Sequence, residues 1–293
     1  MPEIERPDGA RIHYQVHGEG FPVLLLAPGG VSSQIECWDE NFYHPVRELS
    51  GRFRVIAMDQ RHAGRSPAPT APFSYEQTVG DQLAVLDGLG VERAHVVAAG
   101  SGCVHAWALA RTAPERVVSV VAQQPEGRDA VNTLGTFFTE FDEAMRHVRA
   151  ASFDDPETMG LRAVVEAAVR EPRFSRNPAA GPFAQRLADD PEFREEFLKF
   201  TRESYVTRLV RFRDGFRPDG SAYFSVPEEW MARFPAPLLV LPGGDERHPE
   251  GLAKRLGAEV PRVRLVDAGF DAPERVAGTV AEITGFLAEH TPR

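Results

Sequence analysis

The sequence predicts an α/β protein built on a doubly wound, mostly parallel β-sheet. Continuous apolar runs rich in β-branched residues occupy residues 23–28, 54–59, 94–99 and 117–123. Runs of this kind suit parallel strands that are buried on both faces. Helical patterns separate the runs, as in residues 74–90, where apolar side chains recur at helical spacing. Alternation of strand and helix predicts parallel crossovers with helices on both sides of the sheet.

The remaining segments divide the chain into a core and an insertion. Residues 10–16 alternate between apolar and polar side chains, which indicates an antiparallel edge strand. After Pro125 the pattern becomes helical and more polar as far as about residue 234. Strand–helix alternation then resumes over residues 236–244, 250–256, 263–269 and 273–289. We therefore predict an α/β core, residues 1–125 and 235–293, interrupted by a helical lid, residues 126–234.

Bulk composition excludes several classes of protein. The chain has 293 residues and a formal net charge of -10, whereas a nucleic-acid-binding protein needs a basic face to neutralise phosphates. There are two cysteines, Cys37 and Cys103, and no CxxC pair, so we expect neither a disulfide framework nor a metal site. No apolar run is long enough to span a bilayer, and the first residues lack the apolar core of a signal peptide. We expect a cytoplasmic protein with no membrane partner.

Several short motifs occur in a fixed order along the chain. LLLAPGG is followed by DQRHAGRS, the turn AAGSGC, APERV, LPGGDERHP and VDAGF. In this order the motifs resemble the α/β-hydrolase fold over nearly the whole chain. The resemblance implies an eight-stranded sheet with a lid inserted after the sixth strand. It also implies a nucleophile elbow, a sharp strand-to-helix turn that lifts a reactive side chain above the sheet.

The elbow motif places a glycine where the family has its nucleophile. Counting forward from the strand VERAHVV and counting back from APERV both place Gly100 at that position. Ser101 also satisfies the small-x-Ser-x-small pattern and is the alternative nucleophile. That alternative requires a one-residue slip, which would turn the side chains of the strand to opposite faces. Glycine has no nucleophilic side chain, but it suits unusual backbone dihedrals or a closely approaching ligand.

The usual histidine of the family is also absent. Asp267, Ala268 and Gly269 follow the last strand, and the next residues are phenylalanine and aspartate. The family's acid commonly follows the strand that here precedes Asp245. The chain further resembles an atypical branch of the superfamily that lacks the terminal histidine and often has cysteine at the elbow. That resemblance implies that His248 supplies the imidazole of the site, and the alternative is that His248 caps the following helix.

The resemblance carries over to binding residues as well. In the family, backbone N–H groups bind developing negative charge, and the matching donors here are those of Gly30 and Ser101. Gly29 and Gly100 would border the substrate, and so would Cys37 and Trp38 on the loop after Gly30. A tight turn without a ligand is the alternative for the two glycines. On the same loop, the Glu36 carboxylate is a candidate general base if it is buried, since desolvation raises a carboxyl pKa.

These residues leave three functions open. The first is an enzyme acting on a small organic carbonyl compound through a retained oxyanion hole, without the Ser-His-Asp covalent mechanism. Its reaction would be C–C cleavage, decarboxylation, elimination or cyclisation, and it would need no cofactor. The second is an ester or lactone hydrolase that uses Ser101 or a water activated by His248. The third is a non-catalytic protein that binds a small molecule. A homodimer is compatible with each of them.

Overall fold

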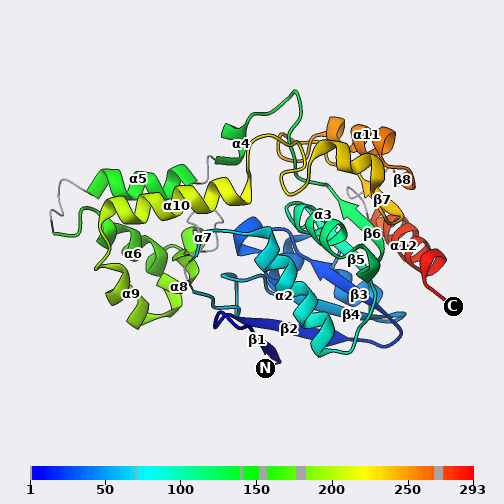
Figure 1. The fold of residues 1–293 in the computed structure, drawn as a ribbon, viewed down its shortest axis with the longest axis horizontal. Coiled ribbons are helices and arrows are strands. Elements are labelled where there is room, and N and C mark those ends of the chain that lie inside the picture. The colour runs from blue at the N-terminus through cyan, green and yellow to red at the C-terminus, as the bar shows by residue number, and fades with distance from the viewer. Residues whose placement is uncertain (1, 70, 139–140, 152–156, 176–182, 267–272) are drawn as a thin grey trace.

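A computed structural model describes residues 2–69, 71–138, 141–151, 157–175, 183–266 and 273–293 of the protein. It contains one eight-stranded sheet in the order β1-β2-β4-β3-β5-β6-β7-β8, with helices on both sides (Figure 1). β1 and β2 are antiparallel to their neighbours, and the other strands are parallel. The predicted doubly wound, mostly parallel sheet is therefore confirmed.

The elements follow one another along the chain as expected for such a sheet. The strands are β1 (Glu3–Glu5), β2 (Arg11–His17), β3 (Phe21–Leu26), β4 (Phe53–Met58), β5 (Ala94–Ala99), β6 (Val117–Gln123), β7 (Leu238–Leu241) and β8 (Val263–Leu265). The helices that flank the sheet are α1 (Pro45–Leu49), α2 (Tyr75–Gly88), α3 (Gly102–Thr112), α11 (Glu250–Glu259) and α12 (Pro273–His290). Short 3-10 helices are η1 (Gly30–Ser32), η2 (Ile35–Glu40), η3 (Pro114–Arg116) and η5 (Glu228–Arg233).

Two strand predictions need correction. The segment predicted as an edge strand forms β2, but the short β1 pairs with its outer side, so β2 is the second strand of the sheet. Three residues of β1 are too few to show a period-2 pattern, which is why the sequence did not reveal it. The last predicted strand, residues 263–269, forms β8 only as far as Leu265, and residues 267–269 lie outside the described part of the chain.

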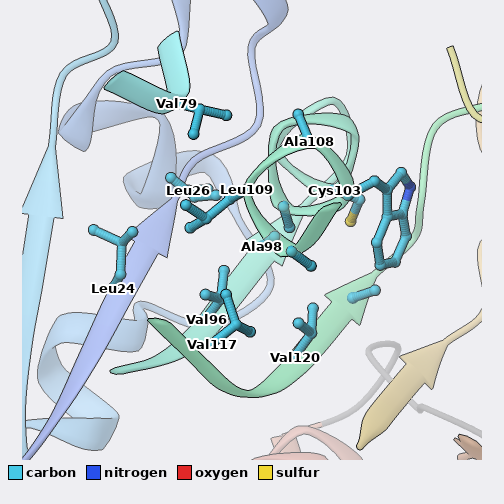
Figure 2. Close-up of a cluster of buried hydrophobic side chains, with 14 of the residues drawn as sticks. Leu24, Leu26, Val79, Val96, Ala98, Cys103, Ala108, Leu109, Val117 and Val120 are labelled. Carbon is cyan, nitrogen blue, oxygen red and sulfur yellow. The ribbon is translucent and has the colours of Figure 1, made fainter. Parts of the chain in front are cut away.

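Alternate residues of the central strands pack into two hydrophobic clusters, one on each face of the sheet. On one face, Leu24, Val96 and Ala98 pack against α2, α3 and α11. On the other, Leu25 and Val97 pack against α1 and α12. Figure 2 shows the first cluster, in which Cys103, Ala108 and Leu109 of α3 lie over the side chains of β3, β5 and β6. Strand pleating places neighbouring residues on opposite faces, and this explains why the strands read as continuous apolar runs.

The inserted segment between β6 and β7 is helical and has a hydrophobic core of its own. Its helices are α4 (Leu134–Phe138), α5 (Phe141–Ala151), α6 (Leu161–Arg170), α7 (Pro172–Ser175), α8 (Ala184–Asp189), α9 (Pro191–Phe197) and α10 (Arg202–Phe216). Figure 1 shows α5, α6, α8, α9 and α10 grouped to one side of the sheet. Phe183, Phe193, Phe197 and Tyr205 are buried against one another in this group. Within the described ranges, no helix is long and apolar enough to cross a membrane.

Candidate active site

A buried strand-to-helix turn forms the centre of the candidate site. β5 is buried throughout and ends at Ala99, Gly100 follows with a φ of 52°, and α3 begins at Gly102. The Gly100 N–H donates to the Gln123 carbonyl oxygen at 2.9 Å, and the Gly100 carbonyl accepts from the Cys103 N–H at 3.1 Å. A positive φ is strained for residues that carry a Cβ. Gly100 thus has the left-handed backbone expected of an elbow, without the side chain.

The turn also depends on Gly102, which sequence reasoning did not single out. A Cβ at this position would collide with the Leu26 carbonyl oxygen and would lie 2.8 Å from that of Ala27. Only glycine allows the start of α3 to approach the end of β3 this closely. The signal that could have found it is the small residue expected two places after the elbow position.

The second part of the site is a carboxylate–imidazole pair on the loop between β7 and α11. Asp245 Oδ2 lies 2.9 Å from His248 Nδ1, and Asp245 Oδ1 accepts the backbone N–H groups of Arg247 and His248 at 2.8 Å. Burial alone would raise the pKa of Asp245, but the hydrogen bonds from His248 and Arg247 outweigh it and lower the pKa. The Asp245 side chain is 66% exposed and that of His248 is 23% exposed. The carboxylate is therefore charged near neutral pH and holds one ring nitrogen.

The other ring nitrogen of His248 faces the elbow. His248 Nε2 lies 3.4 Å from the point that a Cβ on Gly100 would occupy, and Pro28 Cβ lies equally near that point. Gly243 permits this placement, since a Cβ there would lie 2.5 Å from His248 Cβ. His248 precedes the Pro249 N-cap of α11, and no side-chain capping bond is formed at that end of the helix. The imidazole thus borders the space that a side chain at position 100 would enter.

The glycine loop after β3 also contacts the elbow. Gly29 and Gly30 have φ values of 110° and 61°, and the Gly30 N–H donates to Ser101 Oγ at 2.6 Å. Ser101 is 4% exposed and has helical backbone dihedrals at the N-cap of α3. Among the residues that the structure describes, no hydrogen bond joins Ser101 Oγ to the His248 ring. One of the two N–H donors predicted for the oxyanion hole is therefore engaged by a side chain.

The fold and these motifs agree with the comparisons to known proteins. Residues 22–213, well over half of the chain, match the family described as having the alpha/beta hydrolase fold. The chain belongs to the α/β hydrolase fold family. The resemblance of its sequence motifs to this family is therefore confirmed, while the loss of the usual triad stays a prediction. The position where the usual histidine was sought falls in residues 267–272, which lie outside the described residues.

Individual relatives have varied names. The chain is 31% identical over 202 residues to a protein of Variovorax paradoxus provisionally named carbamate hydrolase RutD, a match that spans 68% of each chain. It is 34% identical over 154 residues to epoxide hydrolase B of Mycobacterium tuberculosis, which covers 49% of this chain and 41% of that protein. The enol-lactonase of Burkholderia xenovorans LB400 shares the fold, with a TM-score of 0.62 and 20% identity over 98% of this chain and 100% of that one. The chain spans less than half the length of several curated relatives.

Three further candidate site residues lie on η2, and each of them contacts other residues of the chain. Trp38 is 1% exposed and packs in the hydrophobic cluster that includes α1 and α12. Cys37 Sγ lies 3.5 Å from the Ser32 carbonyl oxygen, and burial raises the pKa of its thiol. Glu36 is exposed and forms an ion pair with Arg65 at 2.6 Å. These contacts describe a core tryptophan, a partly buried thiol with a raised pKa, and an exposed carboxylate in an ion pair.

Hydrogen bonds from the DQR motif stabilise the loop that carries these residues. Asp59 is fully buried, and its carboxylate accepts the Ile35 N–H at 2.8 Å and the Arg65 N–H at 2.9 Å. The Gln60 N–H donates to the Ser33 carbonyl oxygen at 2.9 Å. A buried carboxylate is stable when it accepts several such bonds. The motif thus fixes the glycine loop beside the elbow.

A buried ion pair that sequence reasoning did not predict lies beside the elbow. Glu126 Oε1 lies 2.6 Å from a terminal nitrogen of Arg217, and the two side chains are 4% and 3% exposed. The Glu126 N–H donates to the Gly100 carbonyl oxygen at 3.3 Å, and Arg217 donates to the Phe137 carbonyl oxygen at 2.9 Å. Glu126, at the start of the inserted segment, thereby links the elbow to the C-terminal end of α10. Across the described ranges, no group of three or more His, Cys, Asp or Glu residues is placed to hold a metal ion.

Proposed function

We propose that the protein is an α/β-hydrolase-fold enzyme that acts on a small organic carbonyl compound by proton transfer, without a covalent enzyme intermediate. The observation that carries the proposal is the direction of the His248 ring, whose Nε2 lies 3.4 Å from the missing Cβ of Gly100. His248 is a candidate base beside the elbow, and the residue at the elbow position, Gly100, has no side chain for it to activate. The proton must then come from the substrate or from water.

The carboxylate partner defines what the imidazole can do. In the neutral ring, the nitrogen that faces Asp245 carries the hydrogen, because a carboxylate only accepts. Nε2 then has its lone pair directed toward the space above Gly100 and acts as a general base. Transfer of a proton to Nε2 creates an imidazolium that the charged Asp245 stabilises. This arrangement suits removal of a proton from a substrate carbon or hydroxyl, as in C–C cleavage, elimination or cyclisation. In a decarboxylation, loss of CO2 would leave an enolate, and the protonated imidazole would donate the proton to its carbon.

Hydrolysis by a water molecule is the second candidate, because the same Nε2 position supports it. A water held above Gly100 would meet the base at the place where a serine hydroxyl meets it in a conventional elbow. The relatives named for carbamate and epoxide hydrolysis favour this reaction. The two candidates share one base and differ in the product, since only hydrolysis incorporates an oxygen atom from the solvent.

The test uses a panel of chromogenic acyl esters, lactones, carbamates, β-keto acids and β-hydroxy ketones. We expect turnover of at least one class, and we expect His248→Ala to lower kcat by about 10²–10⁴-fold, the usual contribution of a general base. His17→Ala serves as the matched control. Among the described residues, the side chain of His17 hydrogen-bonds only to Gln15. Labelling with heavy-oxygen water then separates hydrolysis from the other reactions.

A second pair of variants tests the absence of a covalent intermediate. We expect no adduct between the wild-type protein and a fluorophosphonate, and an adduct with Gly100→Ser, whose new hydroxyl would lie beside His248 Nε2. Labelling of Ser101 in the wild-type protein would overturn the proposal in favour of a displaced serine nucleophile. Binding of carbonyl compounds without turnover, unaffected by His248→Ala, would indicate a non-catalytic protein.

A further inference from the structure

The hydroxyl of Ser101 occupies an unusual position in the hydrogen-bond pattern around the elbow. Its oxygen accepts the Gly30 N–H at 2.6 Å, just below the usual range for N–H···O bonds. The Gly30 N–H is one of the two donors that the family directs at developing negative charge. Here the Gly30 N–H donates to Ser101 Oγ and so is not free to bind a ligand directly.

The hydroxyl retains a hydrogen that none of the described residues accepts. Two other buried serines nearby donate theirs to backbone carbonyls, Ser33 to Ala27 at 2.8 Å and Ser66 to Asp59 at 2.9 Å. In the described part of the chain, no bond uses the Ser101 O–H, and its side chain does not cap α3. The backbone N–H of Ser101 likewise has no acceptor among these residues. Two donors of one residue therefore remain at the N-terminus of α3.

We propose that the Ser101 O–H replaces the Gly30 N–H as an oxyanion donor, so that Ser101 stabilises the substrate oxygen with both its hydroxyl and its backbone N–H. The inference rests on the proposed function, because it assigns the partner of the base. The Gly30 N–H polarises the hydroxyl that it donates to, and hydrogen bonds in such a chain strengthen one another. The N-terminal end of α3 adds its positive dipole. The ligand is a carbonyl oxygen that gains negative charge as His248 removes a proton.

This role differs from that of a nucleophile. A nucleophilic serine gives up its proton to a base, and the described contacts of Ser101 Oγ include Gly30 and not His248. A donor keeps its proton and needs only to face the substrate oxygen. Ser101→Ala removes the hydroxyl donor and leaves the buried Gly30 N–H available, so that the N–H replaces part of the lost interaction. The expected loss is consequently smaller than for a nucleophile.

The first test compares Ser101→Ala and Ser101→Thr with the wild-type protein on the substrate that the panel identifies. We expect Ser101→Ala to lower kcat by about tenfold with KM nearly unchanged, somewhat less than the loss of a single isolated oxyanion donor. The pH dependence of kcat should stay the same, since the base is untouched. Ser101→Thr keeps an O–H and should retain most of the kcat. An unchanged or increased kcat in Ser101→Ala would overturn the proposal.

A second readout does not depend on turnover. The anion 4-nitrophenolate carries its charge on one oxygen and reports hydrogen bonding to that oxygen through its visible absorption. We expect Ser101→Ala to weaken its binding by about tenfold, the size expected for one hydrogen bond to a charged group, and His248→Ala not to weaken it. Equal affinity for wild type and Ser101→Ala, or no binding to wild type, would refute the donor role. If His248→Ala keeps full activity while Ser101→Ala loses its affinity, the proposed function fails and the oxyanion site stands.

Discussion

The two halves of the candidate site are built in opposite ways. The elbow, from β5 to α3, is buried. Its geometry is fixed by backbone hydrogen bonds of Gly100 and by the close approach of Gly102 to the end of β3. The loop that carries Asp245 and His248 is partly exposed, and its geometry is fixed by side-chain hydrogen bonds. The geometry of the elbow therefore depends on the packing of the sheet and α3. The loop with Asp245 and His248 can change its geometry with less effect on the sheet. Variants in the two halves should therefore fail by different routes.

The largest effect is expected at Gly102, where the elbow meets β3. Gly102→Ala places a Cβ against the Leu26 carbonyl oxygen, so the start of α3 must shift. We expect the free energy of unfolding to fall by about 3 kcal/mol, the upper part of the usual cost of overpacking. Gly278→Ala is the matched control, because no atom lies within 4 Å of the new Cβ on an exposed face of α12. Urea unfolding of both variants measures the difference, and equal stabilities would contradict this packing.

A pH effect on stability is expected next, from the buried imidazole at the start of β5. Burial, with a smaller contribution from His290, lowers the pKa of His95 to about 4. His95 is fully buried and hydrogen-bonds to Ser119 and Thr291. The unfolded chain binds a proton at this residue below about pH 6.5, and the folded chain does so only below about pH 4. This residue should therefore lower the free energy of unfolding by about 2–3 kcal/mol between these two pH values, and no further below them.

The contribution of His95 is read from a difference in slope. Unfolding of the wild-type protein, His95→Gln and His17→Gln is measured in urea between pH 7 and pH 4. His95→Gln should show a shallower fall of stability with decreasing pH, whatever its stability at pH 7. His17→Gln should keep the wild-type slope. Parallel curves for wild type and His95→Gln would show that the buried ring is not the cause.

The exposed half of the site is tested by two adjacent glycines. A Cβ on Gly243 would lie 2.5 Å from His248 Cβ, whereas one on Gly244 would have no atom within 4 Å. The new Cβ of Gly243→Ala would also meet the His248 carbonyl oxygen, so the loop must shift. This variant should displace the imidazole and lower kcat by about 10–100-fold, as a misplacement near 1 Å can do, and urea unfolding measures the accompanying loss of stability. Gly244→Ala should resemble the wild-type protein in both measurements. Equal kcat values for the two variants would separate His248 from the chemistry.

The smallest effect is expected at Glu36, which the sequence offered as a general base. Its exposed ion pair with Arg65 should contribute less than about 1 kcal/mol to stability. Glu36→Gln should leave kcat within error of the wild-type value, because the carboxylate faces solvent. A loss of kcat as large as that in His248→Ala would return Glu36 to the site. Steady-state kinetics and urea unfolding provide the two numbers.

The parts of the site that sequence reasoning reached are those that depend on near neighbours. Gly100 follows from counting along one strand and one helix, and Asp245 and His248 are each implied by the resemblance of one short motif. Their contact is a finding of the structure. The buried pair of Glu126 and Arg217 joins the start of the inserted segment to the end of α10, some ninety residues along the chain, so no local pattern reveals it. The position of Trp38 on the loop after Gly30 predicted a residue that borders the substrate. The structure shows that its side chain is buried in the core. Sequence spacing gives no measure of burial.

Local sequence by itself determined most of the segments that form strands and helices, the burial of the central strands on both faces, and the position of the glycine elbow. The physical reason is that strand and helix periodicities, and the need for glycine at a positive φ, are properties of a few adjacent residues. The tertiary structure decided which way the functional groups point. The approach of His248 Nε2 to Gly100 and the bond from the Gly30 N–H to Ser101 Oγ join segments far apart in the chain. Such contacts depend on how β3, β5 and β7 align in one sheet, which no single segment specifies.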